Sequence, residues 1–324
     1  MKETIQIKLD ETGQRIDSFL AKKYPEYSRS YFSALISDKK VIVGNCNVKP
    51  SYTVKESDVV EIEFAEKGMG TKIQPENIPI NIIFENDDVI VLNKQAGIVV
   101  HPAAGNLTGT LVNALLNHFP AIQDAVYDKE SEISRIRPGL VHRLDKDTSG
   151  VLIVAKNARS MHSLSKQIQN RSVKKTYVAL CFSWPKKPSG ELIGHLGRHP
   201  KNRKAIAEIG PEKGKEAISN FKVKQHFSDG KNRYSLIEFD IKTGRTHQIR
   251  VQAANMNNPV MGDAVYGNKS SIELSKRLGI KRQLLHAEKL TIALPGDAKK
   301  SDFVAPTPTD LETVLKKLNK FVIR

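Results

Sequence analysis

The segment from Pro138 to Gly150 gathers more reactive side chains than any other stretch of the chain. It contains His142, Arg143 and Asp145 within four positions. In an extended backbone, side chains two positions apart point to the same side, so we expect Arg143 and Asp145 to face one space. A carboxylate beside a guanidinium can act as a nucleophile or a general base. A surface ion pair that helps to cap a turn is the alternative for any Arg-x-Asp taken alone.

A second cluster of polar residues runs from Lys242 to Arg250. Gly244 permits a tight turn, and Arg245 and Arg250 flank a polar centre. On a helix, residues five positions apart diverge by about 140°, so the two arginines should not share a role. One can reach an active-site carboxylate while the other binds phosphate or packs. The downstream segment 258–267 is rich in turn residues and predicts a structural loop.

The charge of the chain indicates a polyanionic partner. It has 51 Lys and Arg against 35 Asp and Glu, a net charge of +16 and a pI near 9.6. The 49 residues from Lys156 to Lys204 hold twelve basic residues and one acid, Glu191, a net charge of +11. Such a stretch predicts a surface that follows RNA phosphates and binds in a salt-dependent way. The alternative is a soluble protein that is simply basic.

The composition excludes several other classes. Apolar residues make up 39% and charged residues 27%, as in soluble globular proteins. No apolar run approaches the roughly 20 residues of a membrane span, and the first residues lack the apolar core of a signal peptide. Cys46 and Cys181 stand 135 positions apart without a zinc-binding pattern. We therefore expect a cytoplasmic protein with no disulfide, metal, membrane contact or small-molecule cofactor.

Two regions must position these residues. Residues 15–64 predict a small module with two helices, Arg15–Lys23 and one that Ser28 caps, followed by strands at 41–43 and 59–64. This order fits an RNA-binding module, with a dimerisation or packing module as the alternative. Residues 65–78 lose periodicity, contain two glycines and a proline, and predict a linker.

Residues 79–324 predict an α+β catalytic domain built on a mixed, largely antiparallel sheet, whose strand order the sequence does not give. Apolar runs alternate with helical patterns along this region. The expected strands are Val89–Leu92, Val151–Ala155, Tyr177–Phe182 and Tyr234–Ile241, and the expected helices are Leu111–Phe119, Ser160–Gln169 and Thr307–Phe321.

Four blocks in order resemble the RluA family of RNA pseudouridine synthases. The family's signature is similar to His142–Gly150, and its second conserved block is similar to Arg245–Tyr266. Lys174–Tyr177 resembles its Lys-x-Tyr segment, and Asn93–Pro102 resembles its opening block. Residues 15–64 resemble the S4 RNA-binding domain that precedes the catalytic domain in the RluC and RluD branches. Gln95 and Gln252 depart from the residues that the family often has there, Pro and His.

The resemblance implies isomerisation of uridine to pseudouridine, most simply in 23S rRNA as in the RluD branch. It implies that Asp145 is the essential carboxylate, as a nucleophile at C1′ or as a base that removes the 2′ proton. The resemblance further implies three roles. Arg245 is the partner of that carboxylate, Arg143 fills the space that a flipped uridine leaves, and Tyr177 stacks on the uracil and assists proton removal from C5. The expected partner is 23S rRNA or the pre-50S particle. A tRNA substrate and a non-catalytic RNA-binding or ribosome-assembly factor are the alternatives.

Overall fold

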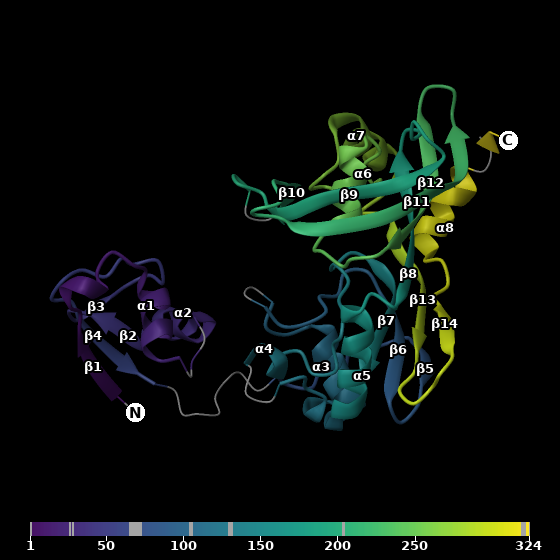
Figure 1. Ribbon diagram of the computed structural model, residues 1–324. Helices are drawn as coiled ribbons and strands as arrows, with labels where there is room; N and C mark the ends of the chain where they lie inside the picture. Colours follow the sequence, from purple (N-terminus) through teal and green to yellow (C-terminus); the bar gives the residue numbers. More distant parts are fainter. Residues whose placement is uncertain are drawn as a thin grey trace. The chain divides into compact units, whose positions relative to one another are not determined.

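The computed structural model describes residues 2–25, 27, 29–64, 73–103, 106–128, 132–202, 205–318 and 322–323. Its contacts divide the chain into two compact units, Met1–Lys72 and Ile73–Arg324. We describe each unit by itself (Figure 1).

The first unit packs two helices on a four-stranded antiparallel sheet. The sheet order is β1 (Lys2–Gln6), β4 (Val59–Glu63), β2 (Val41–Val43) and β3 (Cys46–Asn47). The helices are α1 (Ile16–Lys23) and α2 (Arg29–Ser37), with a short 3-10 turn, η1, at Leu9–Glu11. Both helices and both strands that the sequence predicted are present. The predicted cap, Ser28, lies outside the described residues.

The compact unit begins before residue 15, where the predicted small module begins, because strand β1 belongs to it. Strand β1 pairs with β4 along its whole length, from Lys2 opposite Glu63 to Gln6 opposite Val59. The sequence analysis missed β1 because its side chains are exposed or only half-buried, so it lacks an apolar face. The core of the unit consists of residues from the helices and the inner strands, among them Ile16, Leu20, Phe32, Val60 and Ile62.

The second unit is built on one large mixed sheet. Its described strands follow the order β10 (Ile206–Glu208), β9 (Ser189–Arg198), β11 (Lys215–Ser228), β12 (Arg233–Ile241), β8 (Lys174–Phe182), β13 (Leu285–Ala293), β7 (Ser149–Ala155), β6 (Val89–Lys94) and β5 (Ile82–Glu85). Strand β14 (Lys300–Val304) pairs with β13, and β15 (Val322–Ile323) pairs with β11. Among the described pairs only β13 with β7 is parallel. The predicted mixed, largely antiparallel sheet is therefore confirmed.

Helices complete the unit and agree with the three predicted segments. They are α3 (Leu111–His118), η2 (Pro120–Asp124), α4 (Glu132–Arg135), α5 (Ala158–Gln169), α6 (Gln248–Asn255), α7 (Lys269–Leu278) and α8 (Thr309–Leu318). Thr110 caps α3 and Asn157 caps α5 by accepting a backbone N–H with the side chain.

Strand β7 is buried along its whole length and anchors the domain. On one face Leu152 and Val154 join the core that contains α3, and on the other Val151 and Ile153 join the core that contains α5. A strand covered on both faces reads as a continuous apolar run rather than an alternating one. The loop that carries Asp145 leads directly into this rigid strand.

The predicted linker 65–78 is too long at its C-terminal end. Residues 65–72 lie outside the described residues, but residues from Ile73 onward belong to the second unit. Ile73 packs against its main core, the Asn113 side chain donates to the carbonyl of Gln74, and the backbone N–H of Glu76 donates to the carbonyl of Asn113. These contacts are long-range, so the local sequence pattern did not indicate them.

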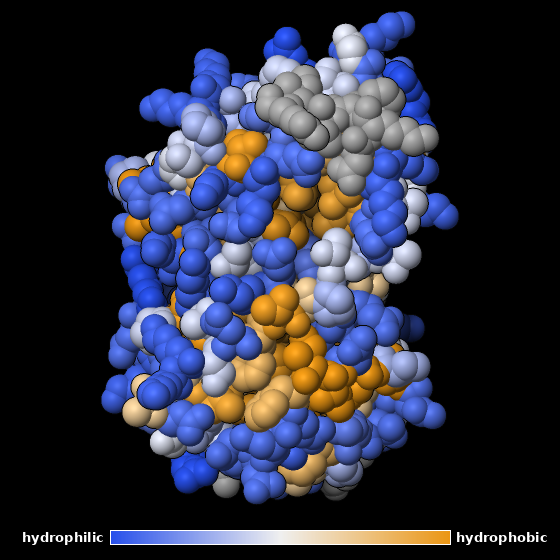
Figure 2. Space-filling model, turned by 90° about the vertical axis from the view of Figure 1, so that its right-hand side faces the viewer, coloured by the Kyte–Doolittle hydropathy of each residue, from blue (hydrophilic) through white to orange (hydrophobic). Residues whose placement is uncertain are grey.

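The surface of the catalytic unit is mainly hydrophilic on the face that Figure 2 shows, with apolar residues gathered in its lower half. Single exposed apolar residues such as Val304 on β14 are normal for a globular protein. In the parts of the chain that the structure describes, no helix is both long and apolar enough to cross a membrane.

Candidate active site

Two cations, the buried Lys94 and the partly buried Arg282, hold the loop that carries Asp145. The Lys94 ammonium donates to the carbonyls of Gln95, Lys146 and Thr148, at 2.8, 2.9 and 2.9 Å. Arg282 donates to the carbonyl of Asp147 at 2.9 Å from the other side. Because three carbonyls converge on one ammonium, the backbone of this loop is fixed independently of the side chains that it presents.

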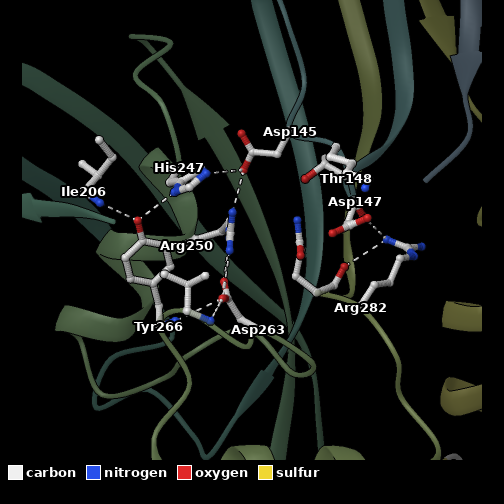
Figure 3. A network of polar contacts seen from close by, with 12 residues as sticks. Asp145, Asp147, Thr148, Ile206, His247, Arg250, Asp263, Tyr266 and Arg282 are labelled. Carbon is white, nitrogen blue, oxygen red and sulfur yellow. Dashed lines mark hydrogen bonds and ion pairs between the residues drawn. The ribbon is translucent and has the colours of Figure 1, made fainter. Parts of the chain in front are cut away.

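Asp145 projects from this loop onto a buried arginine (Figure 3). The Arg250 guanidinium donates to Asp145 Oδ2 at 3.1 Å. The same guanidinium donates to both carboxylate oxygens of Asp263, at 2.6 and 2.9 Å. Asp263 is fully buried and in turn accepts the backbone N–H groups of Val265 and Tyr266. Arg250 is thus held in a fixed orientation by one carboxylate while it presents a remaining donor to the other.

The predicted partner of Asp145, Arg245, is wrong. Arg245 precedes helix α6, and its Nε donates to the carbonyl of Glu216 on β11 at 2.9 Å. Arg250 lies inside α6 and is the arginine that contacts Asp145. The two arginines thus have different partners. The sequence alone did not show which arginine contacts Asp145. The answer depends on where α6 begins, because this sets the direction in which each side chain points.

His247 and Tyr266 extend the network from Asp145. His247 Nε2 lies 3.9 Å from Asp145 Oδ2, and its Nδ1 lies 2.7 Å from the hydroxyl of Tyr266. The Tyr266 hydroxyl accepts the backbone N–H of Ile206 on β10 at 2.8 Å. His247 has φ of 56° as the first residue before α6, a left-handed backbone uncommon for a non-glycine residue. This turn brings its ring back over the cleft.

A buried amide network holds the turn that precedes α6. The Gln248 side chain accepts from the Thr243 hydroxyl and the Arg245 N–H, and donates to the Ile218 carbonyl. Gln252, where the family often has His, accepts from the Ser219 hydroxyl and donates to two backbone carbonyls. The glutamine at position 252 therefore fills a structural position in this chain.

An open cleft joins the residues that the sequence analysis selected. Arg143, Asp145, Tyr177 and Arg245 all line it. The other residues of the lining come from the loop before β7, the end of β12, the segment around α6 and the start of β13: Leu144, Thr148, Ile241, Gly244, Thr246, His247, Gln248, Ile249, Arg250 and Leu285. Arg143 is exposed, Asp145 is half-buried and Tyr177 is buried. The structure thus brings the four predicted site residues to one space.

Burial and neighbouring charges alter the acidity of this site. Burial, together with the charge of Asp145, raises the pKa of Tyr177, so its hydroxyl holds its proton. Burial lowers the pKa of His247, against the opposing effect of Asp145. Burial acts to lower the pKa of Arg250, but the hydrogen bonds and charges of Asp263 and Asp145 raise it further than burial lowers it. The arrangement is a carboxylate, a permanent cation and a protonated phenol around one cleft.

The basic stretch 156–204 is only partly available for phosphate. Lys156 pairs with Glu85, Arg159 with Asp88, Arg171 with Glu216 and Lys174 with Asp240. Other basic residues of the stretch remain exposed, among them Lys186, Lys187, Arg198 and Lys201. The net charge counted along the chain therefore overstates the local charge, because acids from other segments neutralise part of it.

Sequence reasoning missed several residues that build the site. Asp263 and Tyr266 lie in the segment 258–267, for which it predicted only a structural loop, and Lys94 and Arg282 were not selected at all. A lysine that follows the apolar run Val89–Leu92 is a weak sign of a buried cation. Nothing local indicates Arg282, whose partners at positions 147 and 310 are distant in the chain.

Comparison with known proteins identifies the family to which the sequence and the fold belong. Residues 88–255 match the RNA pseudouridylate synthase family and residues 14–60 match the S4 domain. An uncharacterized RNA pseudouridine synthase of Chlorobaculum parvum is 38% identical over 327 residues, which cover 97% of each chain. Ribosomal large subunit pseudouridine synthase D of Pasteurella multocida is 36% identical over 97% of this chain and 94% of its own. The solved structure of human RNA Pseudouridylate Synthase Domain Containing 1 has the same fold, with a TM-score of 0.55 and 23% identity over 75% of this chain and 96% of its own.

These matches define the class of protein: the chain belongs to the RNA pseudouridylate synthase family. It is an RNA pseudouridine synthase with an N-terminal S4 domain, similar over nearly its whole length to synthases of the D type. The family resemblance seen in the sequence, including the branch that carries an S4 domain, is confirmed.

Proposed function

We propose that this synthase modifies uridines of 23S rRNA and that Asp145 is its essential carboxylate. The observation that carries the proposal is the position of Asp145, half-buried in an open cleft and bonded to the buried guanidinium of Arg250. Relatives named for the ribosomal large subunit support rRNA as the substrate. The partner is then 23S rRNA or the pre-50S particle in the cytoplasm, and the reaction needs no small-molecule cofactor.

The chemistry requires the uridine to leave its stack. The N1–C1′ bond breaks, the base turns, C5 bonds to C1′, C5 loses its proton and N1 gains one. Neither C1′ nor C5 can be handled inside a helix, so the nucleotide is flipped at a cost of a few kcal/mol. Arg143 is exposed at the rim of the cleft and is well placed to occupy the space that the uridine leaves.

Asp145 acts on the ribose in either of two ways. It attacks C1′ as a nucleophile or removes the 2′ proton, and both need the ionised carboxylate. The guanidinium of Arg250 donates a hydrogen bond to this carboxylate at 3.1 Å. Because Arg250 is also bonded twice to Asp263, the pair does not need to reorganise when charge on Asp145 changes during the reaction.

Tyr177 and Arg245 act on the base and its surroundings. Tyr177 lines the same cleft, so its ring can stack on the uracil while its hydroxyl assists proton removal from C5. Arg245 lines the cleft while its Nε donates to the Glu216 carbonyl, which suits a contact to RNA rather than to Asp145.

The test is to delete the gene and map pseudouridines across rRNA and tRNA by chemical modification and primer extension. We expect specific 23S rRNA sites to disappear and to return with the wild-type chain but not with Asp145→Ala, which should still bind RNA. Loss of tRNA sites alone would overturn the rRNA assignment. Full restoration by Asp145→Ala would support a non-catalytic assembly factor instead.

A further inference from the structure

Three side chains, His101, Arg137 and Arg143, lie close enough for their charges to act on one another, and the described residues offer them no acidic partner. We call them the cationic cluster. Arg137 follows helix α4 and begins the turn that leads to Asp145, where its carbonyl accepts the N–H of Leu140. His101 follows Val100, whose carbonyl accepts the N–H of Val112 on α3. Arg143 lines the cleft itself.

Two polar atoms of the cluster are buried without a hydrogen-bond partner among the residues that the structure describes. They are Nε of Arg137 and Nδ1 of His101, and the His101 residue is only 4% exposed. Buried polar groups in native proteins almost always have a partner, so an unsatisfied pair in one place calls for a ligand. Both atoms can donate a hydrogen bond, because Arg Nε always carries a proton and neutral His carries one on either nitrogen.

The charges that act on the cluster are all positive. Burial, together with the charges of Arg137 and Arg143, lowers the pKa of His101 to about 4. Burial lowers the pKa of Arg137, and Arg143 adds to this effect. In the described chain no acid opposes these effects, whereas Arg250 and Arg282 in the same domain are paired with Asp263 and Asp310. An anion is therefore the ligand that the cluster would stabilise most.

We propose that the cationic cluster binds one phosphodiester group of the RNA, next to the nucleotide that enters the cleft. The guanidiniums of Arg137 and Arg143 donate to its non-bridging oxygens, and His101 donates from Nδ1 as a neutral ring. This site rests on the proposed entry of RNA at Arg143, because that residue belongs both to the cluster and to the cleft. The phosphate then fixes the register of the strand, while Asp145 acts on the ribose.

The test measures binding of in vitro-transcribed 23S rRNA to the full chain at several salt concentrations. Each phosphate contact contributes close to one unit to the slope of log K against log salt. We expect Arg137→Gln to lower the slope by roughly one and the affinity by roughly tenfold at low salt. Arg137→Lys should restore the slope, because it keeps the charge. His101→Gln should weaken binding without changing the slope, because the ring is neutral.

The matched control is Arg277→Gln on α7, an exposed arginine at the opposite end of the catalytic unit from α3 and α4 (Figure 1). The slope of log K against log salt for this variant should equal that of the wild type. An unchanged slope for Arg137→Gln, with thermal unfolding like that of the wild type, overturns the proposal. A second result would also overturn it. If the His101 NMR signal responds to inorganic phosphate while Arg137→Gln leaves the salt slope of rRNA binding unchanged, the cluster is a site for free anions. These outcomes are separate from a failure of the proposed function, because that function is tested by pseudouridine formation with Asp145→Ala and not by RNA binding.

Discussion

The carboxylate of Asp145 is bonded to the guanidinium of Arg250, 105 positions further along the chain, at 3.1 Å. Asp263 holds that guanidinium with two further hydrogen bonds, so the three residues form one charge-assisted network. A cation fixed between two carboxylates satisfies both and links the buried Asp263 to the half-buried Asp145.

Replacing Arg250 should destabilise the protein much more than replacing Arg245. In Arg250→Gln the fully buried carboxylate of Asp263 loses its cation, which typically costs about 3–5 kcal/mol. Arg245→Gln loses one hydrogen bond to a backbone carbonyl, worth about 1 kcal/mol. Urea unfolding of both variants measures the difference. Equal free energies of unfolding would show that the network contributes nothing beyond a single hydrogen bond.

Lys94→Met should lower both stability and activity. The carbonyls of Gln95, Lys146 and Thr148 would lose their shared donor, at a cost of about 2–5 kcal/mol in all. The loop that presents Asp145 would then relax, so kcat should fall more than RNA affinity. The control is Lys146→Met, an exposed lysine of the same loop, which should change neither. Normal kcat in a folded Lys94→Met variant would argue against this support.

Gly150→Ala should be far more damaging than Gly97→Ala. Both glycines have positive φ, +116° and +91°, so both variants carry backbone strain of about 1–3 kcal/mol. A Cβ at position 150 would also collide with the carbonyl oxygen of Ala287 on β13, whereas a Cβ at position 97 meets open space. Forcing β7 away from β13 should add about 1–3 kcal/mol. Thermal unfolding compares the two variants, and similar midpoints would contradict the prediction.

Tyr177→Phe should keep RNA affinity and lose turnover. The ring that stacks on the uracil remains, whereas the hydroxyl that assists proton removal is gone, and such groups contribute roughly 100-fold or more. The hydroxyl makes no hydrogen bond to the described residues, so its loss should leave stability unchanged. Single-turnover pseudouridine formation and RNA binding are measured in parallel. An unchanged rate of pseudouridine formation would show that Tyr177 only stacks on the uracil and that its hydroxyl takes no part in the reaction.

His142 should make the protein less stable in acid. Burial, with a further effect of Lys175, lowers the pKa of His142 to about 3, and its Nε2 accepts the N–H of Ile153 at 3.1 Å. Between about pH 3 and 6.5 the unfolded chain binds more protons at this position than the folded one. The free energy of unfolding therefore rises with pH across that window, by about 1.4 kcal/mol for each unit of the pKa difference.

His142→Gln provides the comparison, because the amide oxygen can accept the same N–H without titrating. Its stability should fall less than that of the wild type when the pH is lowered from 6.5 to 4. Urea unfolding at several pH values measures both proteins. Parallel curves would mean that His142 titrates alike in the folded and unfolded states.

Much of the fold followed from local patterns in the sequence. The runs Val89–Leu92 and Val151–Ala155 gave strands because a strand buried on both faces needs unbroken apolar residues. The alternation of Ile237, Phe239 and Ile241 gave β12, which exposes one face more than the other. Strand β1 was missed, and the linker extended too far, because long-range pairing and packing hold those residues.

The sequence by itself determined the chemistry that the site contains. The spacing of Arg143 and Asp145, the charge of the chain and four ordered blocks indicated an RNA pseudouridine synthase, and the four selected residues line one cleft. Only the tertiary structure decided which residues act on one another. It paired Asp145 with Arg250 instead of Arg245, and it brought Asp263, Tyr266, Lys94 and Arg282 to the site. The physical reason is that ion pairs and carbonyl contacts between segments more than 50 positions apart depend on how strands and turns meet, which no local pattern encodes.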